Sequence, residues 1–201
     1  MKKMLLAVSF VLASTAAQAD SLSLLSYGTT TISGDANDVT GQAIGTTISK
    51  GLLVADDPFQ WVEFTYLGSE AANNNILREV LIGSDTLFNN WGSTVGDTAY
   101  IQAGFLGDLW FGFQDLSSGT STRWNGSSSI GYLLSGEAAA AFGSGFEYVL
   151  GFNDSSKVDG DFDDLVVGVK AVNAVPVPAA LPLLASALGM FGVARRRKTL
   201  A

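Results

Sequence analysis

The sequence contains neither cysteine nor histidine. Without cysteine there are no disulfide bonds, so an exported domain must be stabilised by its hydrophobic core or by bound ions. Without histidine, Ser-His-Asp and Cys-His catalysis, histidine zinc sites and a histidine general base are excluded. The G-x-S-x-G, P-loop and G-x-G-x-x-G motifs are also absent. The common nucleophilic and nucleotide-dependent enzyme classes therefore have no sequence support.

Positive charge is scarce outside the two ends of the chain. Six of the eleven Lys and Arg residues lie at positions 2–3 and 195–198, whereas all nineteen Asp and Glu residues lie within 20–178. The region 20–178 therefore carries five positive and nineteen negative side chains, a net charge of −14. Such a charge makes nucleic acid and anionic lipid poor partners and divalent cations plausible ones.

The first nineteen residues have the three parts of a secretory signal peptide. Lys2 and Lys3 precede an apolar run from Met4 to about Ala16, and the small residues Ala17 and Ala19 flank a cleavage site. The apolar run is short for a membrane span, which favours cleavage before Asp20 over the alternative of an N-terminal anchor helix. We therefore expect export by the Sec pathway and removal of residues 1–19 by signal peptidase.

The last 27 residues, 175–201, combine prolines, an apolar run and a basic end. Pro176 and Pro178 disfavour a regular helix and favour extended backbone. Residues 179–194 are apolar or small, near the lower length limit for crossing a bilayer, and RRRK follows at 195–198. Because positive charge holds its side of a membrane segment in the cytoplasm, we expect an exported chain to stall here. A permanent C-terminal anchor is the alternative.

These features together resemble the PEP-CTERM sorting signal in its VPxPA variant, with a valine between the two prolines. The matching positions are Val175, Pro176, Val177, Pro178, Ala179, Arg195, Arg196 and Arg197. The resemblance implies a protein of a Gram-negative bacterium that makes extracellular polysaccharide. It also implies transient anchoring in the inner membrane, processing by an exosortase, and delivery to the cell surface or the extracellular matrix.

Residues 20–174 are long enough for one domain with a substantial core. Short runs of alternating apolar and polar residues, separated by Gly, Asn, Ser and Asp, predict strands and turns. The core stripes expected in four strands are Val62, Phe64 and Tyr66; Leu109, Phe111 and Phe113; Phe146, Tyr148, Leu150 and Phe152; and Leu165, Val167, Val169 and Ala171.

Weaker strand patterns occur in SLSLLSYG and TAYIQAGF, whereas ILREVLIG and EAAAAFG are suited to a helical turn or two. DLSSGTSTRWNGSSS has the composition of a long surface loop. The pattern as a whole predicts an all-β fold consisting of a single antiparallel β-sandwich, jelly-roll-like in type.

An acidic cluster lies near the end of this domain. Hard oxygen ligands at alternating positions suit Ca²⁺, and closely spaced carboxylates repel unless a cation or solvent screens them. The candidate calcium ligands are Asp154, Asp159, Asp161, Asp163 and Asp164. The spacing departs from an EF-hand, because Asp164 and Lys170 stand where that loop has its Gly and its bidentate Glu. A solvated acidic turn is the alternative.

The segment GFEYVLGFND…DGDFDDLVVGV resembles the closing hairpin of an uncharacterised family of exported bacterial β-sandwich domains. FTYLGSEAANNN resembles an early strand and loop of such domains in PEP-CTERM proteins. The resemblance implies a role at the cell surface or in the matrix, and it singles out the acidic residues 159, 161, 163 and 164 for ion binding.

Tryptophan suggests a different kind of site. Trp61, Trp110 and Trp124 can stack on sugar rings, and Trp61 and Trp110 lie opposite their strands' core stripes. Packing in the core or at a strand edge is the alternative. We therefore expect a non-enzymatic structural or adhesive protein associated with exopolysaccharide, or alternatively a carbohydrate-binding module.

A glycan-processing enzyme is a less favoured hypothesis. It would pair an Asp with one of Glu63, Glu79, Glu137 and Glu147. The sequence fixes no such pair at the required separation.

Overall fold

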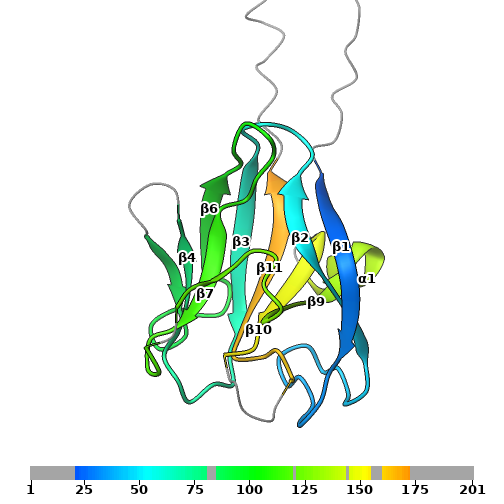
Figure 1. Cartoon of the computed structure of the whole chain (residues 1–201), viewed down its shortest axis with the longest axis vertical. Coiled ribbons are helices and arrows are strands. Elements are labelled where there is room, and N and C mark those ends of the chain that lie inside the picture. Colours follow the sequence, from blue (N-terminus) through cyan, green and yellow to red (C-terminus); the bar gives the residue numbers. More distant parts are fainter. Residues whose placement is uncertain (1–20, 81–84, 120, 144, 155–159, 173–201) are drawn as a thin grey trace, which may run out of the picture. The chain divides into compact units, whose positions relative to one another are not determined.

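The computed structural model describes residues 21–80, 85–119, 121–143, 145–154 and 160–172, all within the compact unit Asp20–Val175. These residues form two antiparallel sheets, of seven and four strands, and one short helix (Figure 1). The predicted all-β antiparallel architecture is thereby confirmed. None of the helices in these ranges is long and apolar enough to span a membrane, and the predicted segment 179–194 lies outside them.

The order of strands in each sheet differs from their order in the sequence. The seven-stranded sheet runs β1 (Leu22–Thr31), β2 (Thr47–Ala55), β9 (Ile130–Ser135), β10 (Tyr148–Phe152), β11 (Leu165–Val172), β3 (Trp61–Gly68) and β6 (Thr98–Gln102). The four-stranded sheet runs β5 (Thr86–Asn89), β4 (Asn75–Glu79), β7 (Phe111–Asp115) and β8 (Arg123–Trp124).

Aromatic side chains join the two sheets. The rings of Phe64 and Phe111 meet edge to face at 5.1 Å, and Phe113 stacks on Phe152 at the same distance. The main core cluster includes the predicted stripes of β3, β7 and β11, which alternate inward as expected. Each buried Phe contributes roughly 1.5–3 kcal/mol of burial free energy, so this aromatic layer is a principal stabilising element.

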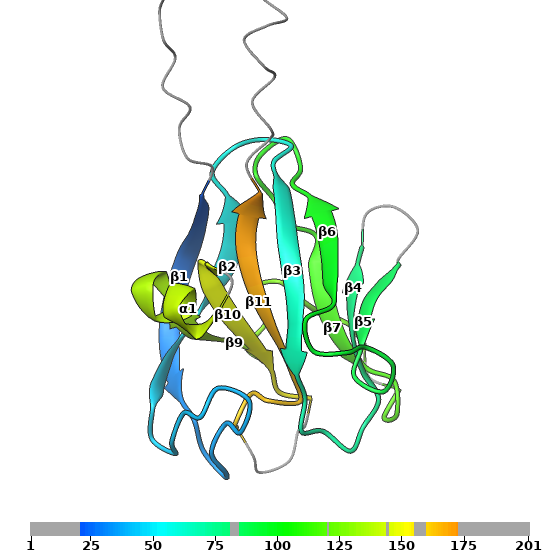
Figure 2. The ribbon, with the colours of Figure 1, turned by 180° about the vertical axis from the view of Figure 1, so that it is seen from behind.

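A second cluster covers the opposite face of the larger sheet. It contains Ala139 of helix α1 (Gly136–Phe142), together with Phe146, Val149 and Val166. Figure 2 shows α1 in front of this face. The prediction that Phe146 shares a face with Leu150 is wrong, because β10 begins only at Tyr148 and Phe146 precedes it. Its ring instead lies against Gly168, where an added Cβ would come within 2.6 Å of the ring.

The weaker patterns had mixed outcomes. SLSLLSYG lies in β1 except for its first residue, the first five residues of TAYIQAGF form β6, and EAAAAFG lies in α1 except for its last residue. ILREVLIG was expected to be helical, but its first half is in β4, which pairs with strands on both sides and buries Leu77. The predicted surface loop contains the two-residue strand β8. Three further strands, β2, β5 and β9, were not predicted. The strands β2 and β9 bury side chains on both faces and so lack clean alternation, and β5 has only four residues.

Candidate functional site

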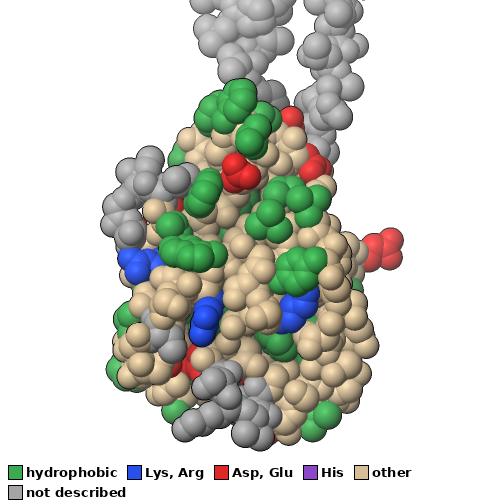
Figure 3. All heavy atoms as spheres, viewed as in Figure 1, with side chains coloured by type: hydrophobic (Ala, Val, Ile, Leu, Met, Phe, Trp, Pro, Cys, Tyr) green, Lys and Arg blue, Asp and Glu red, His purple; other side chains and the backbone are tan. Residues whose placement is uncertain are grey.

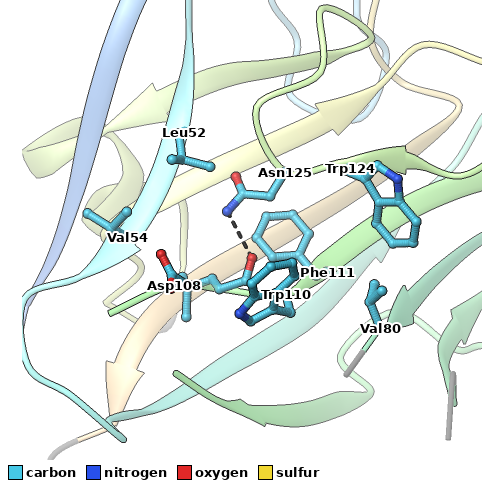
Figure 4. Close-up of a pocket in the computed structure, with 9 residues that line it drawn as sticks. Leu52, Val54, Val80, Asp108, Trp110, Phe111, Trp124 and Asn125 are labelled. Atoms are coloured by element: carbon cyan, nitrogen blue, oxygen red, sulfur yellow. Dashed lines mark hydrogen bonds between the residues drawn. The ribbon is translucent and has the colours of Figure 1, made fainter. Parts of the chain in front are cut away.

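A pocket of about 380 Å³ opens where β7 and β8 of the smaller sheet approach β2 of the larger sheet (Figure 4). Its walls are mainly apolar and aromatic, with two polar side chains. The lining residues are Leu52, Val54, Val80, Asp108, Leu109, Trp110, Phe111, Trp124 and Asn125. The pocket combines contributions from positions 52 to 125, so it exists only in the folded domain.

Trp110 and Trp124 supply the aromatic surface of the pocket, and they are 45% and 48% exposed. Trp110 directly precedes β7, where Phe111 points into the core and alternation turns its neighbour outward. Trp124 is paired across the sheet with Gly112. An added Cβ at Gly112 would lie 2.8 Å from the Trp124 ring, so the ring rests on the sheet because residue 112 has no side chain.

Trp61, the third predicted stacking residue, lies elsewhere. It is 47% exposed and belongs to β3 of the larger sheet, where it pairs with Gln102 and Val172. The structure therefore brings Trp110 and Trp124 into one pocket and leaves Trp61 apart from them. Sequence alternation could show that Trp61 and Trp110 point away from the core, but not which strands become neighbours.

Asn125 fixes the wall of the pocket. Its side-chain oxygen accepts hydrogen bonds from the Leu53 amide at 3.0 Å and the Tyr132 hydroxyl at 3.2 Å. Its amide donates to the carbonyls of Leu53 at 2.8 Å and Leu109 at 3.1 Å; the latter bond is dashed in Figure 4. The side chain therefore ties the segment after β8 to β2, to β9 and to the start of β7. Sequence reasoning did not single it out, and only its Asn-Gly turn pair marked the position.

Asp108 is the charged side chain in the pocket. It is half-buried, and no described residue donates a hydrogen bond or forms an ion pair to its carboxylate. Its backbone carbonyl accepts a hydrogen bond from Gly104, which holds this residue at the end of a tight turn. The carboxylate is thus placed to accept hydrogen bonds from a ligand.

A polar rim continues beyond Trp124 on the outer face of the smaller sheet. Arg78 of β4 is paired with Gly112, on the side away from β8. Its guanidinium donates to the Gln114 side chain at 3.1 Å, and Thr122 donates to the same oxygen at 3.4 Å. In Figure 3 basic and hydrophobic side chains share one face of the molecule. Aromatic and polar groups therefore lie together on this face.

The predicted calcium ligands fall in a different region, around the turn before β11. Asp154 accepts hydrogen bonds from the amides of Asn75 at 2.7 Å and Asn73 at 3.3 Å, and Asp164 accepts one from the Asp154 backbone at 2.6 Å. Among the residues that the structure describes, no three metal-ligating side chains are grouped to hold an ion. Asp159 lies outside those residues, and calcium binding stays a prediction.

Asp163 and Asp161 are both buried beside this turn. Asp163 accepts a hydrogen bond from the Asp38 backbone at 2.9 Å, and the Asn37 amide donates to the Asp161 carbonyl. Burial raises the pKa of Asp163 to about 8, and the charges of Asp161 and Glu70 add to that rise. These acids anchor the turn to the loop after β1, and binding a cation there would require Asp163 to lose its proton near neutral pH.

None of the four glutamates considered for catalysis lines the pocket. Glu63 forms an ion pair with Lys170 at 2.9 Å, and Glu147 accepts hydrogen bonds from the backbones of Leu22 and Ala171, both at 2.7 Å. Burial, with the charge of Asp85, raises the pKa of Glu79 in β4. Glu137 lies in the first turn of α1.

The predicted signal-cleavage residues Ala17 and Ala19 and the predicted sorting signal at 175–201 lie outside the described part of the chain. Comparison with known proteins adds no identity, because no protein-family model, curated protein or solved structure matches the chain.

Proposed function

We propose that the mature domain is a carbohydrate-binding module of an exported protein, and that it attaches this protein to extracellular polysaccharide. The observation that carries the proposal is the pair of half-exposed tryptophans, Trp110 and Trp124, in one apolar pocket beside the carboxylate of Asp108. The role is non-enzymatic, structural and adhesive.

The chemistry of the pocket supports a sugar ligand. Tryptophan offers a large apolar ring face that packs against the C–H faces of a pyranose ring, while a few polar groups fix the orientation of the hydroxyls. The pocket, at about 380 Å³, lies within the usual range for small-ligand sites. Asp108 accepts hydrogen bonds from sugar hydroxyls, and Arg78 and Gln114 extend the polar surface for a longer chain.

The ends of the chain support the location. The signal peptide at 1–19 implies export, and the tail at 175–201 implies transient inner-membrane anchoring followed by exosortase processing. The finer architecture belongs to the same proposal: two packed antiparallel sheets of seven and four strands support a jelly-roll type of sandwich. Sandwich faces that carry exposed aromatics are suited to binding polymers.

The test is binding of matrix polysaccharide to the full chain and to single tryptophan variants. Trp110→Ala and Trp124→Ala should each weaken binding roughly tenfold or more, as expected for aromatic anchors that a ligand covers on binding. Trp91→Ala is the matched control, because Trp91 is 66% exposed but does not line the pocket. Affinity electrophoresis and tryptophan fluorescence provide the measurements. Equal affinity in all three variants would contradict the proposal.

A further inference from the structure

Three large apolar side chains project from one end of the β domain. Phe59 is 55% exposed, Phe105 72% and Leu106 77%, and the two rings lie 6.1 Å apart. We call these three residues the apolar tip. They come from the loop between β2 and β3 and from the loop that follows β6, and Figure 3 shows hydrophobic side chains gathered at this upper end. Contiguous exposed apolar surface of this kind marks an interaction site.

Backbone contacts hold the tip in place. The Phe59 amide donates to the Gly104 carbonyl at 3.3 Å, and the Gln102 side chain donates to the Phe59 carbonyl at 2.9 Å. Phe59 adopts a left-handed backbone conformation, with φ of 58°, which costs roughly 1–2 kcal/mol for a residue other than glycine. The fold therefore presents the phenyl ring to solvent despite both a conformational and a hydration cost.

The tip lies where the described chain begins and ends. The carbonyl of Ser21 accepts a hydrogen bond from Asp56 at 3.0 Å, at the start of the first tip loop. Val172, the last residue of β11, pairs with Trp61, which is two residues after Phe59. The first and last described residues, Ser21 and Val172, therefore both lie at the apolar end of the β domain.

The length of the following chain limits how far this end can lie from a membrane. Residues 173–178 separate Val172 from the apolar run that begins at Ala179. At full extension, the seven steps from residue 172 to residue 179 span at most about 25 Å. If residues 179–194 are in a bilayer, Val172 therefore lies within this distance of the point where the chain enters the bilayer.

We propose that the apolar tip inserts into the bilayer surface while the C-terminal segment holds the exported chain in the membrane. This inference rests on the part of the proposed function in which residues 179–194 enter the inner membrane. Asp56 and Asp57 are exposed beside Phe59 and disfavour anionic headgroups, so the partner is the zwitterionic lipid surface. Contact at the tip orients the domain and limits its motion above the membrane while the tail awaits processing.

The absence of cysteine allows a site-specific test in the full chain. Leu106→Cys places a single label at the tip. Ser118→Cys is the matched control, because Ser118 is also exposed and follows the far end of β7. Each variant is labelled with an environment-sensitive fluorophore and reconstituted into phosphatidylcholine vesicles. The label at residue 106 should show a blue shift and quenching by spin-labelled lipid, whereas the label at residue 118 should show neither.

Flotation of the vesicles distinguishes failure of the tip proposal from failure of the proposed membrane insertion of the tail. If the chain floats with the vesicles but the two labels respond alike, the tip proposal is overturned and attachment of the chain to the membrane stands. If the chain does not float with the vesicles, membrane insertion of the tail is itself rejected, and the tip proposal falls with it. A Phe105→Ser, Phe59→Ser background should abolish the response of the residue 106 label without preventing flotation.

Discussion

Gly112 shows how a single residue shapes the candidate site. It lies in β7 between Arg78 and Trp124, and its lack of a side chain gives the Trp124 ring room to rest on the sheet. A methyl group there would also approach the Thr122 side chain to 2.6 Å. The orientation of the tryptophan is thus decided by a neighbouring strand, not by the residues around it in the sequence.

We expect Gly112→Ala to weaken polysaccharide binding about as much as Trp124→Ala, roughly tenfold or more, because the new Cβ displaces the ring. Gly92→Ala is the control, since an added Cβ at Gly92 meets no atom within 4 Å. Binding is measured by affinity electrophoresis. A Gly112→Ala protein that folds and binds with unchanged affinity would show that the position of Trp124 does not matter.

The buried carboxyl of Asp163 predicts a pH dependence of stability. Burial raises its pKa from 3.8 to about 8, so the folded protein retains a proton that the unfolded chain releases. The free energy of unfolding should therefore fall as the pH rises between those two values. Burial lowers the pKa of Lys50 to about 7. This group therefore makes the free energy of unfolding rise with pH, but only from about pH 7 upward.

The melting temperature should be higher at about pH 5 than at about pH 7, and Asp163→Asn should reduce this difference. An amide carries no charge and still accepts the hydrogen bond from Asp38. Thermal melts at constant ionic strength provide the measurement. An undiminished pH dependence in Asp163→Asn would assign the effect to other groups. Glu79 is one of them, because burial raises its pKa as well.

At the scale of elements, Asn125 connects the segment after β8 to strands of the larger sheet, with which β8 is not paired. Its four hydrogen bonds reach Leu53 in β2, Leu109 before β7 and Tyr132 in β9. It thereby helps to fix the segment after the two-residue strand β8, together with the hydrogen bonds that Tyr27 and Lys50 donate to the backbone of this segment. The wall of the pocket depends on this one side chain.

Asn125→Ala should lower the free energy of unfolding by ~2–4 kcal/mol and weaken polysaccharide binding, because it leaves buried backbone groups without partners. Asn125→Asp should cost at least as much, since its second carboxylate oxygen would face the carbonyl oxygens of Leu53 and Leu109, to which the amide now donates. Denaturant unfolding and the binding assay are run on both variants. A stable Asn125→Ala protein with full affinity would remove Asn125 from the construction of the pocket.

At the scale of the whole molecule, the two ends and the β domain have separate roles. In the function that we propose, the ends carry the export and sorting signals, and the domain carries the pocket and the apolar tip. The apolar tip requires a membrane only while the C-terminal segment is attached. Processing would therefore remove the tether and release the domain to the surface or the matrix.

We expect the protein recovered from the cell-surface fraction to have an intact mass that corresponds to a start at Asp20 and an end near Pro178, with or without an added group. The VPVPA motif followed by an apolar run and RRRK is the basis for this expectation. Mass spectrometry of the intact chain is the measurement. A chain that still ends at Ala201 would instead make the tail a permanent anchor.

Much of the fold could be predicted because the alternation of apolar and polar residues in several segments matches the two faces of the strands that they form. The stripes of β3, β7 and β11 alternate as their sequences indicate, since every second side chain of each strand lies on the core between the sheets; this holds even in β11, although its Val166 joins the second cluster. The strands β2 and β9 could not be recognised in this way, and Phe146 was assigned to the wrong face. In these segments the second apolar cluster also buries side chains on the opposite face, which obscures the alternation.

By itself, the sequence determined the all-β class, the excluded chemistries and the outward orientation of Trp61 and Trp110, because these depend on composition and on the two-residue period of a strand. Only the tertiary structure decided that Trp110 meets Trp124 while Trp61 lies on the other sheet. It also decided that Phe59 and Phe105 form one tip. Such contacts join residues far apart in the chain, and strand order and register, which no local pattern encodes, bring them together.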